Sequence, residues 1–221
     1  MAVVDLAYCT LEELRIYIGS TATNEALVEA ARVGAARAID KYCHRRFYRD
    51  QQVADDEVVD AEPSARLFRV APFMGCSPEV VYVPDFVPDV DGFLVETDDD
   101  GDGTFETTWA EGTDYELEPL NPAADYDGPQ NSIRAVGDRC FPVAGRGRRR
   151  AGLRVTALWG FPSIPDDVHQ ANLIVALDLV KAKDAPFGTA GVADLGLIRI
   201  RTNPLAQVLL DPFVLVDDGI A

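Results

Sequence analysis

The chain has 221 residues, with 37 acidic against 20 basic side chains and a formal net charge of −17 at pH 7. Its 48% hydrophobic content excludes a disordered chain, and no apolar run reaches the roughly 20 residues that a transmembrane helix needs. The acidity disfavours general nucleic-acid binding, which needs a positive surface against the phosphates, and the start of the chain lacks signal-peptide features, so we expect a cytosolic protein.

Two helices are predicted at the start of the chain. Thr10 and Glu13 match a capping box that opens a short helix ending at Gly19. A longer helix is expected from about Asn24 to Arg46, with a stripe of small residues that lets another helix approach closely. His44, at the end of this helix, suits the negative end of the helix dipole and needs no catalytic role.

The middle of the chain, from about Gln51 to Gly160, consists of short β-branched or aromatic runs separated by proline, glycine and aspartate. The predicted strands are Leu67–Val70, Glu79–Val83, Phe93–Glu96, Phe105–Trp109, Tyr115–Leu117, Ser132–Val136 and Leu153–Trp159. These runs predict an antiparallel β-rich insert between helical parts.

Charge is separated along this insert. From Asp91 to Glu118 there are eleven acidic residues and no basic one, whereas Arg134 to Arg154 contains seven arginines and one aspartate. The densest basic group is Arg146, Arg148, Arg149 and Arg150, in a glycine-flanked loop. This loop is either a solvated surface or a contact for an acidic protein surface or DNA phosphate.

Asp98, Asp100 and Asp102, followed by Gly103, form the one local pattern with recognisable chemistry. Alternating aspartates before a glycine match the first half of a calcium-binding loop. The second half does not match, because Trp109 stands where such a loop supplies its last carboxylate. A hairpin tip and a weak calcium site both remain open.

An apolar helix is predicted over Val168–Leu179, after a proline and two aspartates that suit a helix start. Its apolar positions cover more than one face, so we expect a core helix that packs on Asn24–Arg46. Asp178, inside this run, is expected to have a partner or to lie at the solvent edge.

The rest of the chain, residues 188–221, is expected to be a docking arm with a glycine-rich, flexible root. It contains a strand-like run, Leu197–Arg201, and a short helix that Asn203 caps and Pro212 ends. The arm buries its apolar tip either on its own domain or on another chain. The residues assigned to this contact are Ile198, Arg199, Ile200, Arg201, Pro204, Leu205, Val208, Leu209 and Phe213.

These elements predict an α+β fold: a small helical bundle from both ends of the chain, an inserted antiparallel β-rich region and a flexible C-terminal arm. The predicted parts are residues 1–50, 51–160, 161–187 and 188–221. The four cysteines are widely spaced and are expected to be free thiols. No catalytic motif occurs, so we expect neither an enzyme nor a cofactor beyond weak calcium binding.

The order of these elements resembles the head-to-tail connector, or adaptor, proteins of tailed bacteriophages. About half the chain carries the resemblance, in motifs at both ends. The matching runs are Tyr8 to Gly19, Ala38 to Phe47, Trp159 to Pro162, Ile164-Pro165, Gln170-Ala171, Ala185 to Gly188, Arg199 to Arg201, Pro204 and Leu209 to Phe213.

The resemblance implies a structural virion protein at the head–tail interface, assembled in the host cytoplasm. Copies would form a ring, commonly of twelve, beneath the portal protein. The ring would extend the channel through which genomic DNA passes without specific binding, and would receive the next tail-completion, or stopper, protein. The arm would reach the portal, and no membrane would be involved.

Overall fold

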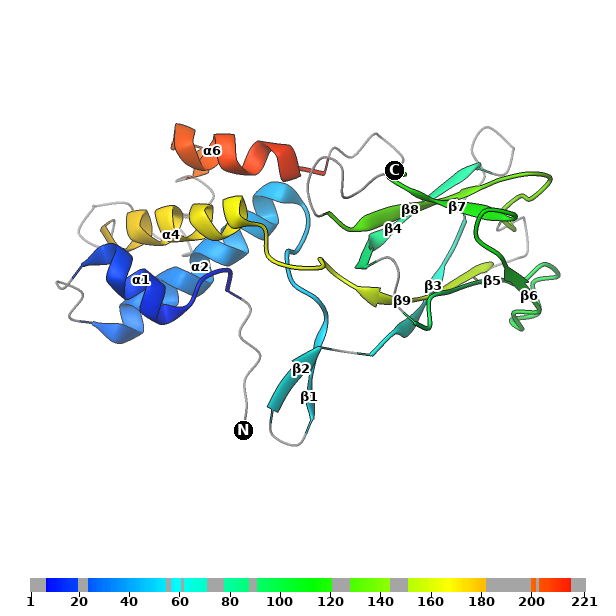
Figure 1. Ribbon diagram of the computed structural model, residues 1–221, viewed down its shortest axis with the longest axis horizontal. Coiled ribbons are helices and arrows are strands. Elements are labelled where there is room, and N and C mark those ends of the chain that lie inside the picture. Colours follow the sequence, from blue (N-terminus) through cyan, green and yellow to red (C-terminus); the bar gives the residue numbers. More distant parts are fainter. Residues whose placement is uncertain are drawn as a thin grey trace. The chain divides into compact units, whose positions relative to one another are not determined.

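The computed structural model describes residues 7–19, 24–54, 57–60, 62–70, 78–87, 91–120, 128–143, 151–181, 200–201 and 203–215, with backbone alone for those between 51 and 60. Helices come from both ends of the chain and a curled antiparallel sheet comes from its middle (Figure 1). The predicted α+β fold is confirmed. The chain divides into a β unit, Arg49–Pro162, and a helical unit, Val3–Tyr48 with Ser163–Ala221.

The helical unit is organised around its second-longest helix, α4. Its elements are α1 (Leu11–Ile18), α2 (Glu25–Cys43), α4 (Asp166–Lys181), α6 (Pro204–Leu210) and the 3₁₀ turn η2 (Asp211–Phe213). Helix α4 packs against α1, α2 and α6, and Figure 1 shows α1 and α6 on different sides of it. The predicted pairing of the long N-terminal helix with the apolar C-terminal helix is therefore confirmed.

Helix α1 begins with the predicted capping box. The Thr10 hydroxyl accepts a hydrogen bond from the Glu13 backbone N–H (3.2 Å), and a Glu13 carboxylate oxygen accepts one from the Thr10 backbone N–H (2.7 Å). Glu13 also lies 3.3 Å from the His169 ring on α4. Gly19, with φ of 83°, ends the helix as predicted. The first turn of α1 is thus stabilised by its own capping box and by the contact between Glu13 and α4.

Helix α2 ends three residues earlier than predicted. His44 adopts a left-handed conformation (φ 56°), which stops the helix after Cys43. The turn sends the fully buried Phe47 into the core beside Tyr8, with ring centroids 5.7 Å apart in an edge-on arrangement. The histidine therefore has a structural role, as a helix-ending residue.

The interface between α2 and α4 combines small apolar residues with a buried polar side chain, Asn172. Ala31, Ala35 and Ala38 on α2 are buried, as the small-residue stripe predicted. Asn172 on α4 is fully buried, and its amide N–H donates to the Arg32 carbonyl at 3.4 Å. Its side-chain oxygen has no hydrogen-bond partner among the described residues.

The β unit contains one seven-stranded antiparallel sheet and a separate hairpin. The sheet strands are β3 (Ser64–Phe68), β4 (Val80–Val87), β5 (Leu94–Thr97), β6 (Thr107–Trp109), β7 (Tyr115–Glu118), β8 (Gln130–Ala135) and β9 (Leu153–Trp159). Their order is β6-β5-β9-β4-β8-β7, with β3 also paired to β9. Each of these seven strands overlaps a predicted strand, and all but β9 differ from the prediction in the first or last residue. The hairpin of β1 (Gln51–Ala54) and β2 (Glu57–Asp60) was not predicted.

Strand β9 lies at the centre of the sheet because it pairs with β3, β4 and β5. Its last residue, Trp159, is 1% exposed, and its ring N–H donates to the Ser64 carbonyl at 2.8 Å. The Arg66 guanidinium stacks over the indole at 4.4 Å and pairs with Asp50 at 2.5 Å. These contacts fix the end of β9, which leads into α4.

Candidate functional site

The acidic loop, residues 98–106, connects β5 to β6 and is folded around its own aspartates. Asp98 directly follows β5 and is 1% exposed. Its carboxylate accepts hydrogen bonds from the backbone N–H groups of Gly101 (2.5 Å) and Gly103 (2.9 Å). Both glycines have positive φ, of 80° and 98°, which a side chain would disfavour. The loop is therefore shaped by Asp98, and the glycines permit the turn.

The other aspartates of the acidic loop repeat this arrangement at its rim. Asp100 accepts from the Asp102 backbone N–H at 3.0 Å, and Asp102 accepts from the Thr104 backbone N–H at 2.6 Å. The Thr107 hydroxyl donates to Asp99 at 2.7 Å. The predicted hairpin tip of turn-forming aspartates is thus present, with each turn closed by a carboxylate.

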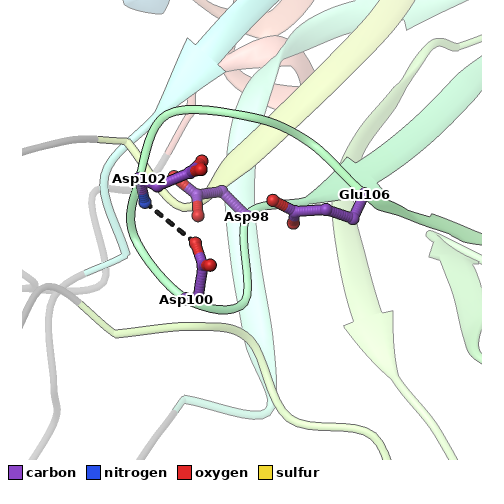
Figure 2. Close-up of side chains that lie close together, drawn as sticks. All are labelled: Asp98, Asp100, Asp102 and Glu106. Atoms are coloured by element: carbon purple, nitrogen blue, oxygen red, sulfur yellow. Dashed lines mark hydrogen bonds between the residues drawn. The ribbon is translucent and has the colours of Figure 1, made fainter.

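The same loop gathers four carboxylates that could hold a metal ion. One oxygen each from Asp98, Asp100, Asp102 and Glu106 lies within 4.8 Å of the others (Figure 2). Hard oxygen ligands in this arrangement suit calcium, at ligand distances of roughly 2.3–2.6 Å. Sequence reasoning missed Glu106, because it applied a helical calcium-loop template that ends at Trp109. Trp109 is instead 5% exposed and stacks on Phe141 at 5.0 Å.

The base of the acidic loop is held by the neighbouring strand. The Asp98 backbone N–H donates to the Gly152 carbonyl at 3.1 Å. On the strands just below, both carboxylate oxygens of Glu96 accept from Arg154, at 2.7 and 2.5 Å, and this guanidinium lies 4.5 Å from the Phe105 ring centre. The Glu96 pair holds β5 against β9 where the loop begins.

Negative charge is concentrated in the β unit, whose sequence contains 23 acidic and 10 basic residues. Several of its arginines are already paired with carboxylates of the same unit. Arg134 pairs with Glu118 at 2.6 Å, and Arg139 pairs with Asp114 at 2.6 Å. The predicted basic contact, Arg146, Arg148, Arg149 and Arg150, lies outside the described residues.

The assigned contact residues of the arm divide into an inner and an outer group. Ile200 and Phe213 are buried in the helical unit, at 0% and 3% exposure. Leu205 and Val208 are 57% and 70% exposed, Leu209 is half-buried, and Arg201 and Pro204 are exposed. Ile198 and Arg199 lie outside the described residues, as does the predicted flexible root. Ile200 and Arg201 are helical, so the predicted strand is wrong at these two positions.

The inner face of α6 does not include the assigned contact residues Leu205 and Val208. Its buried residues are Ala206 and Leu210, next to Phe213 in η2. The Phe213 ring packs edge-on against Phe47 with centroids 5.6 Å apart. Asn203 caps α6 by accepting from the Leu205 and Ala206 backbone N–H groups, at 3.1 and 3.3 Å. The tip of the arm is therefore docked on its own unit.

Polar contacts strengthen this docking at both ends of α6. The Asn203 amide donates to Asp178 on α4 at 3.2 Å, which gives this helix carboxylate its partner. The Tyr42 hydroxyl donates to Asp211 at 2.5 Å, and this hydrogen bond raises the pKa of Tyr42 to about 12. The Leu215 backbone N–H donates to the Cys43 carbonyl at 3.0 Å. The arm thereby covers Cys43, and burial raises the pKa of this thiol to about 12.

A buried polar cluster holds the segment before α1 against α2. The Tyr8 hydroxyl donates to Asp40 and accepts from the Phe47 backbone N–H at 3.1 Å. Burial, reinforced by the Asp40 charge, raises the pKa of Tyr8 well above its usual range. Burial also raises the pKa of Asp40, although Arg37 pairs with it at 2.9 Å. These hydrogen bonds and the ion pair offset the cost of burying the polar groups.

The fold of the chain is that of a solved neck structure. The matching structure is described as the neck of an empty GTA particle computed with C6 symmetry. The match has a TM-score of 0.50 and 14% sequence identity, and covers 99% of this chain and 97% of the other. The likeness therefore extends over both units and establishes a shared fold.

No family model matches the chain, and no curated protein matches it significantly. Within the described ranges, none of the helices has the length and apolar character to span a membrane.

Proposed function

We propose that the chain is a structural protein of the neck of a tailed, phage-like particle, a connector between head and tail. The observation that carries the proposal is the likeness to a neck chain over nearly the full length of both proteins. In this proposal the protein is not an enzyme. It acts in the virion at the head–tail interface, after assembly in the host cytoplasm.

The proposed assembly is a ring of twelve copies beneath the portal protein. A six-fold neck, as in the matching particle, is compatible with rings of six or twelve copies. The ring extends the DNA channel and receives the tail-completion, or stopper, protein on its other side. The net charge of −17 supports passage of DNA without specific binding, because an acidic surface repels phosphates.

The outer residues of the arm are proposed to contact another chain of the neck, either the portal protein or a neighbouring copy. Leu205 and Val208 support this role because both are large, apolar and exposed. Ile200 and Phe213 contribute by holding the arm in place. Arg146 and Arg148–Arg150 are proposed as a separate contact for an acidic protein surface or DNA phosphate.

Electron microscopy of the purified chain, alone and mixed with its portal protein, tests the connector proposal. We expect rings, and in the mixture rings seated on one end of the portal. Light scattering of the same samples gives the number of copies. A chain that neither forms rings nor binds the portal would contradict the proposal.

A second candidate function is calcium binding by the acidic loop, and the convergence of four carboxylate oxygens within 4.8 Å favours it. In this role calcium would fix the loop as part of a binding surface. Asp100 is the informative position, because its side chain accepts from one backbone N–H at the rim. Asp98 is less suitable, since its substitution would also remove the two hydrogen bonds that shape the turn.

Titration calorimetry with calcium chloride tests this candidate. We expect heat of binding at millimolar calcium for the unaltered chain, and a loss of it in Asp100→Asn. Glu111→Gln is the matched control, because Glu111 is equally exposed and acidic but lies outside the four-carboxylate group. Absence of any calcium heat and of any thermal shift would remove this candidate and leave the connector proposal untouched.

A further inference from the structure

Helix α6 presents an apolar outer face that is exposed among the described residues of its unit. Its sequence, Pro-Leu-Ala-Gln-Val-Leu-Leu, contains no charged residue, although surface helices normally carry charges on the solvent side. Ala206 and Leu210 point into the unit, whereas Leu205 and Val208 are 57% and 70% exposed. This outer face is therefore suited to burial against another surface.

Helix α1 has a second exposed apolar group on the same unit. Leu14 is fully buried and anchors the helix, while Ile16 and Tyr17 are 72% and 42% exposed. Glu12 and Glu13, one turn earlier, make the start of this surface acidic. We call Glu12, Ile16 and Tyr17 the α1 patch, and Arg201, Leu205 and Val208 the α6 patch.

The two patches lie on different helices that flank α4. Both α1 and α6 pack on α4, and Figure 1 shows them on different sides of it. A ring with more than two copies needs two different contact surfaces on each subunit, because each copy meets one neighbour on each side. Two separate apolar patches on one compact unit meet this geometric requirement.

We propose that the α6 patch of one copy packs on the α1 patch of the next copy, so that the subunits associate head to tail. This inference rests on the proposed ring. The charges of the two patches are complementary: the α1 patch contains Glu12, which also lies 3.9 Å from Arg15 on the same helix and is followed by Glu13, whereas the α6 patch contains the exposed Arg201 and no acidic residue. Apolar side chains form the centre of the contact and the two charges lie at its rim, as in other protein interfaces.

Two single substitutions block one patch each. Ile16→Asp places a charge in the α1 patch and Val208→Asp places one in the α6 patch, both at exposed positions, so folding is retained. Leu67→Asp on β3 is the matched control, because Leu67 is equally apolar and 61% exposed but lies in the β unit. Far-UV circular dichroism verifies the folded state of all three. If Ile16→Asp or Val208→Asp does not fold, Ile16→Ser or Val208→Ser is used in its place.

Analytical ultracentrifugation over a concentration series measures assembly. We expect the unaltered chain and Leu67→Asp to form the same ring. Each blocked variant should reach half-assembly only at a concentration at least about tenfold higher. A ring that is unaffected by both substitutions would overturn the assigned interface while leaving the proposed function standing. An unaltered chain that stays monomeric at every concentration would overturn the interface and the ring together.

Mixing the two blocked variants tests the head-to-tail direction. Ile16→Asp retains an intact α6 patch and Val208→Asp retains an intact α1 patch, so one productive contact remains between them. We expect a one-to-one pair and no larger species. If the mixture stays monomeric, or if each variant dimerises with itself, the head-to-tail contact is wrong.

A charge exchange gives an independent measurement. Glu12→Arg or Arg201→Glu alone brings like charges together and should weaken assembly, whereas the double variant should restore it. Equal weakening in the double variant would count against the pairing of these two patches.

Discussion

Phe213→Ala is expected to undock the arm without unfolding the helical unit. The side chain is 3% exposed and packs edge-on against Phe47. Replacement of a buried phenylalanine by alanine typically costs about 3–5 kcal/mol. The stability lost in Phe213→Ala cannot exceed the free energy with which the arm docks. Once the arm has detached, Phe213 makes no contacts that the substitution could remove. The helices α2 and α4 keep their own interface.

The size of the effect follows from the lower end of that range. A loss of about 3 kcal/mol raises the undocked fraction by roughly a hundredfold, at about 1.4 kcal/mol for each factor of ten. Leu205→Ala is the matched control on the same helix, since its side chain is 57% exposed. A surface substitution of this kind changes stability by about 0.5 kcal/mol or less, which is roughly a twofold change.

The Cys43 thiol reports arm docking directly. It is fully buried, with its sulfur 3.9 Å from the Leu210 carbonyl oxygen, and its pKa is raised to about 12 by burial. Undocking exposes the thiol and returns its pKa toward the ordinary value, so it reacts with a disulfide reagent. With Cys76→Ser and Cys140→Ser as background, Cys9 is the internal reference, because it is a buried thiol that lies before α1.

We expect Phe213→Ala to accelerate Cys43 labelling by roughly a hundredfold while Cys9 labelling and the main unfolding midpoint stay nearly constant. Equal acceleration at both cysteines would mean that the whole unit unfolds, and an unchanged Cys43 rate would mean that Phe213 does not hold the arm. Either result refutes the reasoning. Deletion of residues 189–221 would be a poorer test, because it also removes Ile200, Leu210 and Phe213 from the core.

Three further predictions concern other parts of the molecule. Hydrogen bonds from the Thr10 backbone and hydroxyl, with the His169 contact, lower the pKa of Glu13 to about 2. The stability that ionised Glu13 gives to the folded state is therefore fully present above its unfolded pKa of about 4.5 and is lost as pH falls toward 2. Amide exchange in α1 should accelerate over that pH range, and Thr10→Ala should make the exchange rate less dependent on pH. Gly152→Ala should destabilise the β unit by about 1–3 kcal/mol in denaturant melts, because its Cβ would lie 2.8 Å from the Pro142 carbonyl oxygen; a neutral effect would show that the backbone yields there. In the same denaturant melts, Asn172→Leu should leave the free energy of unfolding unchanged or raise it, because the buried amide it replaces has one unsatisfied oxygen. Asn172→Ala should clearly lower it. Strong destabilisation by leucine would mean that the hydrogen bond to the Arg32 carbonyl contributes more than its 3.4 Å length suggests.

Elements with a local chemical signal were predictable from the sequence. The capping box of Thr10 and Glu13 requires only residues three positions apart, and it is formed as predicted. The pairing of α2 with α4 followed from small residues on one helix and apolar residues all round the other. The β1–β2 hairpin was missed because its strands are only four residues long and place their apolar residues side by side, so no alternating apolar pattern marks them.

The orientation of α6 could not be predicted from periodicity. Six of its seven residues are apolar, so more than one set of residues at helical spacing could form the buried face. Only the contacts with α2 and α4 decide which set is buried. The alternation at Ile200 and Arg201 is similarly too short to separate a strand from a helical turn. Glu106 was missed because the acidic loop closes into a β-hairpin, in which a carboxylate at the entrance to β6 returns to the aspartates.

The order of the units along the chain has a consequence for synthesis. The β unit is continuous from Arg49 to Pro162, whereas the helical unit is assembled from segments on both sides of it. During translation, α1 and α2 emerge first and must wait for the whole β unit before α4 can cover the small-residue face of α2. We expect the β unit to acquire structure before the helical unit is complete, with α2 exposed to chaperones until α4 leaves the ribosome.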